Sequence, residues 1–215
     1  MEKLLIREFS LQAYTEFSRP IPEGQAELPA LADKMLAAFP YVLRPEDVSV
    51  FSDTKLYGYR LIFKLFNGSA DTTFTSKSVI SNFRDGRTAQ ALSLVSKSVD
   101  AIYKIMVNRP IQFNQLTFAV HAEFGSPEAY KDYTAKFIDT ERGYLSGGKI
   151  VQADARDFKG ELRFSTEKSS VVENGLYVSV QFLTHEPFTS ELSDKMGKRF
   201  TEIASFEGFE IAFPQ

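Results

Sequence analysis

Leu11-Gln12-Ala13-Tyr14-Thr15-Glu16-Phe17 is the stretch that decides the fold, because a second version of it follows 107 residues later. That second version is Phe118-Ala119-Val120-His121-Ala122-Glu123-Phe124. In both versions apolar and polar side chains alternate, which is typical of a strand with one buried face.

Further stretches match at a similar spacing. Ala37-Ala38-Phe39 lies over Ala135-Lys136-Phe137 at an offset of 98, and Leu61-Ile62-Phe63 lies over Leu162-Arg163-Phe164 at 101. At 101, Thr88, Ala91, Val95, Val99 and Ile102 correspond to Thr189, Leu192, Met196, Phe200 and Ile203. The sequence therefore predicts an internal duplication, with α+β repeats at residues 1–107 and 108–215. Two unrelated α+β segments remain the alternative, since elements of one type share apolar periodicity.

The order of elements is also shared by the two halves. In the first half the patterns predict strands at 4–17, 55–66 and 72–80 and helices at 27–39 and 87–107. In the second half they predict strands at 116–124, 162–164, 176–182 and 209–213 and a helix at 190–205. A second helix is predicted after the N-cap Ser126, marked by Tyr130, Tyr133 and Phe137. We expect a β-α-β-β-(β)-α unit in each half, antiparallel sheets each packed against a long helix, and a pseudo-twofold axis between the repeats.

Composition excludes several classes of function. The 215 residues include no cysteine, so disulfides, thiolate metal sites and cysteine nucleophiles are ruled out. The N-terminus has no signal-peptide core, and no run approaches the roughly 18 apolar residues of a membrane span. We therefore expect a cytoplasmic protein that does not act on membranes.

The charge is evenly spread. The formal net charge is −3, and the residues up to Val107 hold 13 basic and 12 acidic side chains. A nucleic-acid-binding protein needs a positive field, which neither half provides, so we expect no nucleic-acid partner.

One motif resembles a phosphate-binding loop. The segment from Gly143 to Lys149 fits the spacing G-x-x-x-x-G-K, but Ile150 stands where a magnesium-binding serine or threonine is required. No buried strand precedes the segment and no amphipathic helix follows it. We interpret it as a glycine-rich hairpin or connecting loop.

Catalytic and metal-binding patterns are equally weak. The two histidines, His121 and His185, lack the spacing of a metal site, and no nucleophile elbow is present. Glu16 and Glu123 hold equivalent positions in the two repeats and could face each other as a carboxylate pair, although two solvated carboxylates are the simpler interpretation. We assign no catalytic residue, metal or cofactor; a serine triad assembled in space stays open.

The remaining candidate surface is the polar side of the strands. If the long helices cover one face of each sheet, the other face carries Gln12 and the proposed binding residues Tyr14, Glu16, His121, Glu123, Arg163 and Gln181. Antiparallel sheets commonly leave one face toward water, and tyrosine and arginine are enriched in protein interfaces.

Two classes of function follow. The first, which the sequence favours, is a non-enzymatic binding or assembly protein that uses this face or an edge strand and self-associates as a homo-oligomer. The alternative is a small-molecule carrier or hydrolase-like enzyme with a helix-grip type of cavity between sheet and helix.

Overall fold

The computed structural model describes residues 2–18, 27–53, 58–106, 109–136, 148–154, 156 and 158–213. Within them the strands are β1 (Glu2–Phe17), β2 (Val48–Asp53), β3 (Gly58–Leu65), β4 (Ala70–Thr75), β5 (Ser78–Gly86), β6 (Ile111–Phe124), β7 (Lys149–Asp154), β8 (Gly160–Lys168), β9 (Gly175–Thr184) and β10 (Phe209–Ala212). The helices are α1 (Glu27–Ala38), α2 (Ala89–Ile105), α3 (Pro127–Thr134) and α4 (Ser190–Phe206), with short 3-10 turns at Pro45–Asp47 and Phe66–Gly68.

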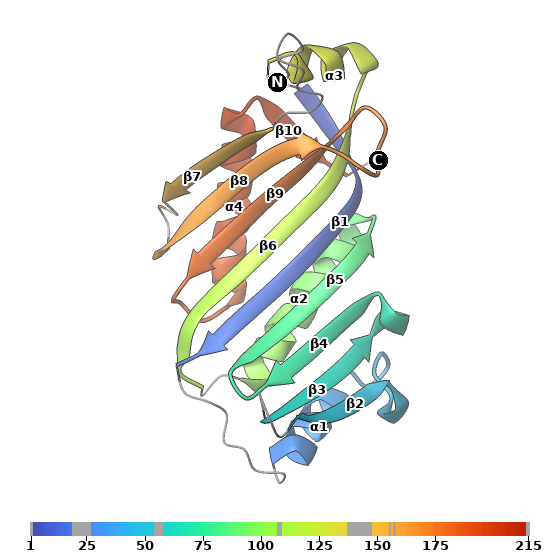
Figure 1. The fold of residues 1–215 in the computed structure, drawn as a ribbon, viewed down its shortest axis with the longest axis vertical. Coiled ribbons are helices and arrows are strands. Elements are labelled where there is room, and N and C mark those ends of the chain that lie inside the picture. The colour runs from blue at the N-terminus through green and yellow to red at the C-terminus, as the bar shows by residue number, and fades with distance from the viewer. Residues whose placement is uncertain are drawn as a thin grey trace.

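The described strands form one mixed α+β arrangement around a single large sheet. Its order is β2-β3-β4-β5-β1-β6-β9-β8-β7, with β10 added to the first residues of β1 (Figure 1). Neighbouring strands are antiparallel except for the parallel pair of β1 and β10. The expectation of separate sheets, one for each repeat, is therefore wrong. The physical reason is that β1 and β6 are the longest of the described strands, and each would have a long unpaired edge if the other did not pair with it.

Both long helices lie on the same face of this sheet, behind the strands in Figure 1. We call this the helix-covered face and the opposite side the open face. The expected alternation in β1 is confirmed, because Phe9, Leu11, Ala13, Thr15 and Phe17 are all buried toward the helices.

An irregularity in β1 could not be read from the alternation. The register against β6 shifts between Ile6 and Glu8, which is a β-bulge. The bulge turns Leu4 and Ile6 to the buried side, although their even numbers would place them with the polar residues. The apolar start of the chain is thereby added to the core.

Most of the predicted elements are present. The four predicted helices begin and end close to their expected residues, and Thr88, Ser126 and Thr189 each cap a helix by accepting a backbone hydrogen bond. Asn67 and Gly68 form a turn with positive φ, as their sequence favours. The predicted run at 72–80 is wrong, because it is divided into β4 and β5 by a tight turn. The edge strands β2 and β7 were not predicted, and Phe137 lies outside the described residues.

A buried hydrogen-bond chain joins α2 to the central strands. Tyr103 on α2 contacts the hydroxyl of Thr15, and Thr15 donates to the amide oxygen of Asn114 at 2.5 Å. Asn114 in turn donates to the backbone carbonyl of Glu186 at 2.6 Å. Since these groups are shielded from water, their polar atoms need one another as partners. This hydrogen-bond chain therefore holds α2, β1, β6 and the segment before α4 in one fixed arrangement.

We expect the Tyr103→Phe variant to differ from the wild type in how its stability depends on pH. Burial raises the pKa of Tyr103 well above its ordinary value of 10, since the ionised form loses its hydration. The native state thus keeps this proton after the unfolded chain has lost it. Stability from this source is complete below about pH 10 and falls at higher pH, by at most about 1.4 kcal/mol per pH unit for one group.

Chemical unfolding at pH 7 and at several values between 9 and 11 would measure both effects. Tyr103→Phe should lose about 1 kcal/mol at pH 7 through the missing hydrogen bond, and its stability should then fall less steeply with alkaline pH than that of the wild type. If the stabilities of the two proteins fell equally with rising pH, the raised pKa of the buried Tyr103 hydroxyl would be contradicted.

Candidate functional site

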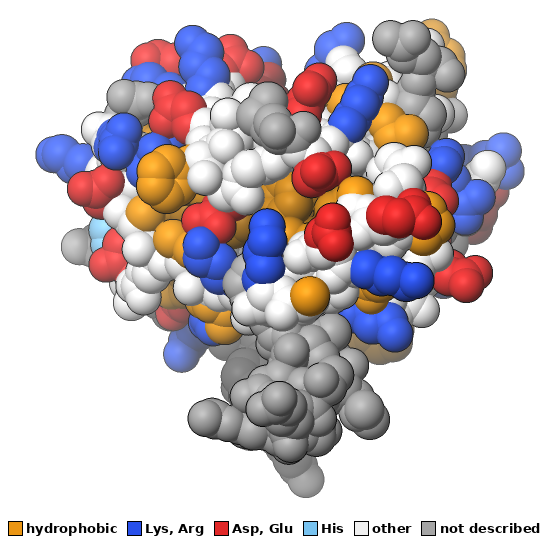
Figure 2. All heavy atoms as spheres, turned by 90° about the horizontal axis from the view of Figure 1, so that it is seen from above, with side chains coloured by type: hydrophobic (Ala, Val, Ile, Leu, Met, Phe, Trp, Pro, Cys, Tyr) orange, Lys and Arg blue, Asp and Glu red, His pale blue; other side chains and the backbone are white. Residues whose placement is uncertain are grey.

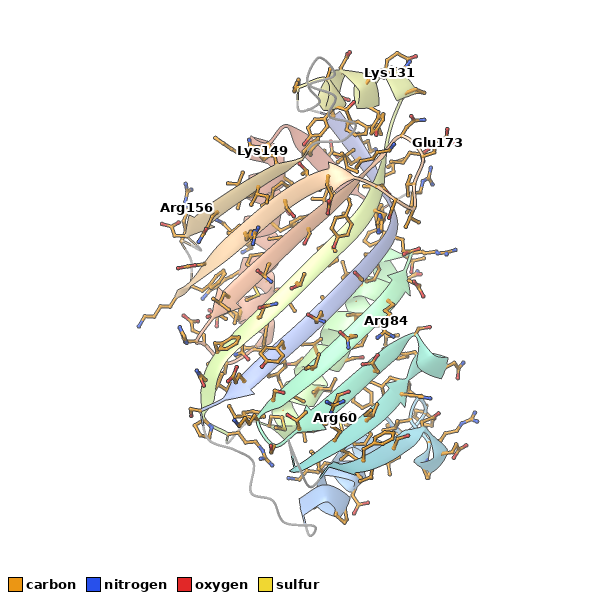
Figure 3. The ribbon with its side chains drawn as sticks, viewed as in Figure 1. Arg60, Arg84, Lys131, Lys149, Arg156 and Glu173 are labelled. Carbon is orange, nitrogen blue, oxygen red and sulfur yellow. The ribbon has the colours of Figure 1, made fainter. Side chains whose placement is uncertain are left out.

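The open face brings all six proposed binding residues onto one surface. Tyr14 and Glu16 come from β1, His121 and Glu123 from β6, Arg163 from β8 and Gln181 from β9. Each lies between fully buried neighbours along its strand. Figure 3 shows this face toward the viewer, with Arg60 and Arg84 on it and the helices behind. The six proposed binding residues do not form a single cluster but are spread over rows of side chains that cross the strands.

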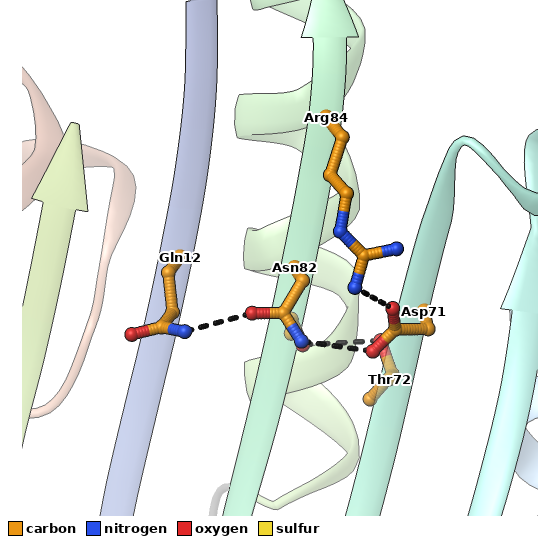
Figure 4. Close-up of polar contacts among 6 residues, drawn as sticks. Gln12, Asp71, Thr72, Asn82 and Arg84 are labelled. Atoms are coloured by element: carbon orange, nitrogen blue, oxygen red, sulfur yellow. Dashed lines mark hydrogen bonds and ion pairs between the residues drawn. The ribbon is translucent and has the colours of Figure 1, made fainter. Parts of the chain in front are cut away.

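A row of amide and hydroxyl side chains, with a charged side chain at each end, crosses the middle of the face. Strand register places them opposite one another in the order Asp71, Asn82, Gln12, Thr117, Gln181 and Arg163, which we call the amide row. Gln12 donates to Asn82 and Asn82 donates to Asp71, both at 2.8 Å, while Arg84 pairs with Asp71 at 2.6 Å (Figure 4). These contacts hold the side chains of one half of the row in a fixed, hydrogen-bonding array.

An apolar band runs beside the amide row, toward the C-terminal end of β1. Tyr14 is its centre, and its ring lies 5.5 Å from that of Phe113. The band consists of the partly exposed side chains Ile62, Ile80, Tyr14, Phe113 and Leu183, from five strands. In the strand register Thr73 lies between Ile62 and Ile80, and Gln115 lies between Tyr14 and Leu183. Apolar groups that remain half-exposed on a sheet face, with polar rows beside them, have the composition of a protein interface.

Tyr14 is held in place by its neighbour Glu16. Its hydroxyl donates to the Glu16 carboxylate at 3.2 Å. Partial burial and the negative charge of Glu16 both raise the pKa of Tyr14, so it stays a neutral donor. The pair thus presents an apolar ring with one polar end and one acidic group beside it.

His121 marks the other end of the face. Its Nδ1 lies 2.9 Å from the hydroxyl of Ser169, and its ring lies 5.0 Å from that of Tyr177. The Ser169 oxygen already accepts hydrogen bonds from the backbone of Val171 and Val172. With both lone pairs used, Ser169 donates its proton to Nδ1, which places the imidazole proton of neutral His121 on Nε2. A hydrogen-bond donor is thereby present at His121 on the open face.

Glu16 and Glu123 do not face each other within the chain. Glu16 lies opposite Phe113, whereas Glu123 lies opposite Leu5 at the far end of the same strand pair. Glu123 is instead paired with Arg7, whose Nε donates to it at 2.7 Å. The two carboxylates therefore cannot act together on one bound group, and the hypothesis of a facing pair is not supported by the register.

The other candidate residues of the sequence are separate from this face or from each other. His185 contacts the backbone carbonyl of Gln112 at 2.6 Å, and no group of acidic and histidine side chains in the described residues could hold a metal ion. Most of the Gly143–Lys149 segment lies outside the described residues. Lys149 itself begins strand β7 and pairs with Glu207 at 2.5 Å, which is unlike the helix start of a phosphate-binding loop.

The open face is hollowed as well as polar. One hollow of about 620 Å³ lies over β7, β8 and β9 and includes Arg163, Ser165, Ser179 and Gln181. Another of about 420 Å³ lies over β5, β1 and β6 and includes Gln12 and Tyr177; Thr117 borders both. Together they form a shallow trough across the strands, which was not predicted because it depends on small side chains meeting in register.

The charged side chains are of mixed sign. Figure 2 shows the end of the molecule seen from above, along its long axis, where lysine and arginine side chains lie among aspartate and glutamate and around a group of apolar side chains. None of the described helices combines the length and the apolar character that crossing a bilayer requires.

Comparison with models of known protein families finds no match, and no curated protein is significantly similar in sequence to this chain. The assignment of function therefore depends on the geometry described above.

We expect Ser169→Ala to release His121 from its fixed tautomer. Loss of the serine hydroxyl leaves the backbone N–H groups of Val171 and Val172 and the imidazole of His121 without their partner, which should cost about 1–3 kcal/mol of stability. Nitrogen-15 NMR of the imidazole should show the proton on Nε2 in the wild type and a tautomer mixture in the variant. A mixture already present in the wild type would contradict the proposed direction of the hydrogen bond.

Proposed function

We propose that the protein is a non-enzymatic binding and assembly protein whose open face docks a second copy of the chain. The observation that carries the proposal is the apolar band around Tyr14, set on an uncovered sheet face between polar rows. Such a band is costly to leave in water and is what the centre of an interface requires.

The size of the face fits this role. Eight strand spacings and about six residues along each strand give an area of roughly 40 by 20 Å, or about 800 Å². A stable interface of standard size uses about 800 Å² from each partner. The open face is therefore large enough to support a dimer by itself.

The charges of the face support a second copy as the partner. Glu16 lies beside the apolar band, and Arg60 lies on the neighbouring part of the same face. Farther along, Glu167 and Arg163 lie on one strand and one side of it. A surface that holds both signs can pair with itself across a twofold axis, whereas a nucleic acid would need one sign only.

The edge strands offer a second route to assembly. Val50 on β2 and Ile150 on β7 are 60% and 61% exposed, and Phe51 beside Val50 is 55% exposed. Unpaired edges with apolar side chains can add a strand from another molecule. Edge pairing is therefore the competing mode of association in the experiment below.

Internal duplication is part of the proposal, with repeats at residues 1–107 and 108–215. Two observations support it. Leu11 and Phe118, which are equivalent in the sequence match, lie directly opposite each other, as residues on a twofold axis would. In addition, α2 and α4 are both 17 residues long and both begin at a capping threonine. A cytoplasmic location also remains a prediction of the sequence.

We expect substitution of Tyr14 or His121 by alanine to weaken self-association at least tenfold. The Tyr14 variant would lose the centre of the apolar band, and the His121 variant would lose the hydrogen-bond donor at the opposite end of the face. Ser179→Arg, which fills the trough with a charged side chain, should abolish association. Sedimentation velocity over a wide range of concentration would measure each constant, with circular dichroism to confirm the fold.

The matched control is Ser93→Arg, because Ser93 is exposed on α2 behind the sheet. Val50→Lys tests the β2 edge separately from the open face, because Val50 lies opposite the buried Leu61 and therefore on the helix-covered side. A strict monomer at high concentration would rule out self-association. Dissociation caused by Val50→Lys, with association unchanged in the Tyr14, His121 and Ser179 variants, would show that the interface is formed by the β2 edge and not by the open face.

A further inference from the structure

A cleft lies on the helix-covered face, between α2 and α4 and above the central strands. Its volume is about 460 Å³, and an adjoining hollow of about 280 Å³ shares Asp100, Phe188 and Thr189 with it. Pockets for small molecules commonly range from about 300 to 1,000 Å³. The space between the helices is thus of a size that a small ligand can use.

The floor and walls of the cleft are apolar. Leu11 from β1 and Leu116 from β6 form the floor, and Val99 and Phe188 stand beside them; all four are buried side chains. Beyond one end, Phe118 packs against Phe200 at 5.6 Å. At the other end the ring of Tyr103 lies 4.7 Å from Phe188. Aromatic contacts therefore border the cleft near both ends, and at the Phe188 end it continues into the adjoining hollow.

Gly197 keeps the α4 side of the cleft open. It lies in the middle of the helix and lines the cleft, and a methyl group added to it would meet no atom within 4 Å. Glycine is unfavourable inside a helix compared with alanine, and here no close packing requires it. Its effect on the structure is to leave space above the apolar floor.

The rim carries an excess of positive charge. Lys97 on α2 and Lys198 on α4 are exposed at the rim, and neither forms an ion pair with another described residue. Asp100 is neutralised by Lys104 at 2.7 Å, which leaves Asp194 as the acidic group of the rim. The start of α4 at Thr189 also borders the cleft and adds the positive end of a helix dipole.

We propose that this cleft binds a small amphipathic anion, with its apolar body on Leu11 and Leu116 and its carboxylate or similar group at Lys97 and Lys198. The site lies on the face opposite the proposed docking surface, so it does not depend on self-association. It gives the protein a ligand-binding function besides assembly.

Fluorescence of anilinonaphthalene sulfonate, an aromatic anion, would test the site in the full chain, with displacement by decanoate and by decylammonium below their micelle concentrations. We expect decanoate to displace the dye at least fivefold better than decylammonium. Gly197→Leu should weaken dye binding at least tenfold while the protein keeps its cooperative unfolding. Thr201→Leu, one turn farther along α4 and exposed, is the matched control and should bind as the wild type does.

The charged rim is tested by the double variant Lys97→Gln/Lys198→Gln, which should bind decanoate and decylammonium equally; Lys131→Gln on α3 is its control. Methyl NMR of the wild type needs no variant and should show decanoate shifting Leu11, Val99 and Leu116. Shifts confined to Ile80 and Leu183 on the open face would overturn the proposal. Undiminished dye binding by folded Gly197→Leu, or equal displacement by the two amphiphiles in the wild type, would do the same.

Discussion

The pairing of β1 with β6 is the constraint on which the rest of the structure depends. The two strands run antiparallel from Leu4 opposite Phe124 to Phe17 opposite Ile111. They join strands that otherwise belong to separate halves of the chain, since β2 to β5 lie on one side and β7 to β9 on the other. Without this pair, each half would expose a long edge and an incomplete core.

This pairing also determines the two surfaces of the molecule. Because β1 and β6 alternate in phase, the large apolar side chains of both strands meet on the helix-covered face. The polar side chains meet on the other face, where Gln12 lies opposite Thr117 and Tyr14 opposite Gln115. The helices α2 and α4 both pack on the helix-covered face, and the cleft over Leu11 and Leu116 lies between them. One strand pair thus produces both the open face and the cleft.

The sequence could predict the local elements better than their assembly. Alternation in 9–17 and 116–124 identified β1, β6 and their buried sides, because a side-chain period of two depends only on neighbours in the chain. The bulge at Arg7 and Glu8 interrupts that period and could not be recognised from it. The short edge strands β2 and β7 were missed because each is only six residues long and its alternation is interrupted by two adjacent apolar residues, Val50-Phe51 in β2 and Ile150-Val151 in β7.

The candidate site was predicted in part for the same reason. The side of the strand on which Tyr14, Glu16, His121, Glu123, Arg163 and Gln181 lie followed from periodicity. Their distances did not, since register between strands is a non-local property; Glu16 and Glu123 are therefore far apart. The apolar band with Ile80, Phe113 and Leu183, and the space that Gly197 leaves above the central strands, arise only when distant segments are brought together.

Native-state hydrogen exchange at increasing urea concentration would test the role of the central pair most directly. If β1 and β6 hold one sheet together, their backbone amides should exchange only through global unfolding, and amides of β4 and β8 should not survive their loss. Exchange of the amides of β1 while those of β8 and β9 remain protected would show two independent halves and would contradict this account.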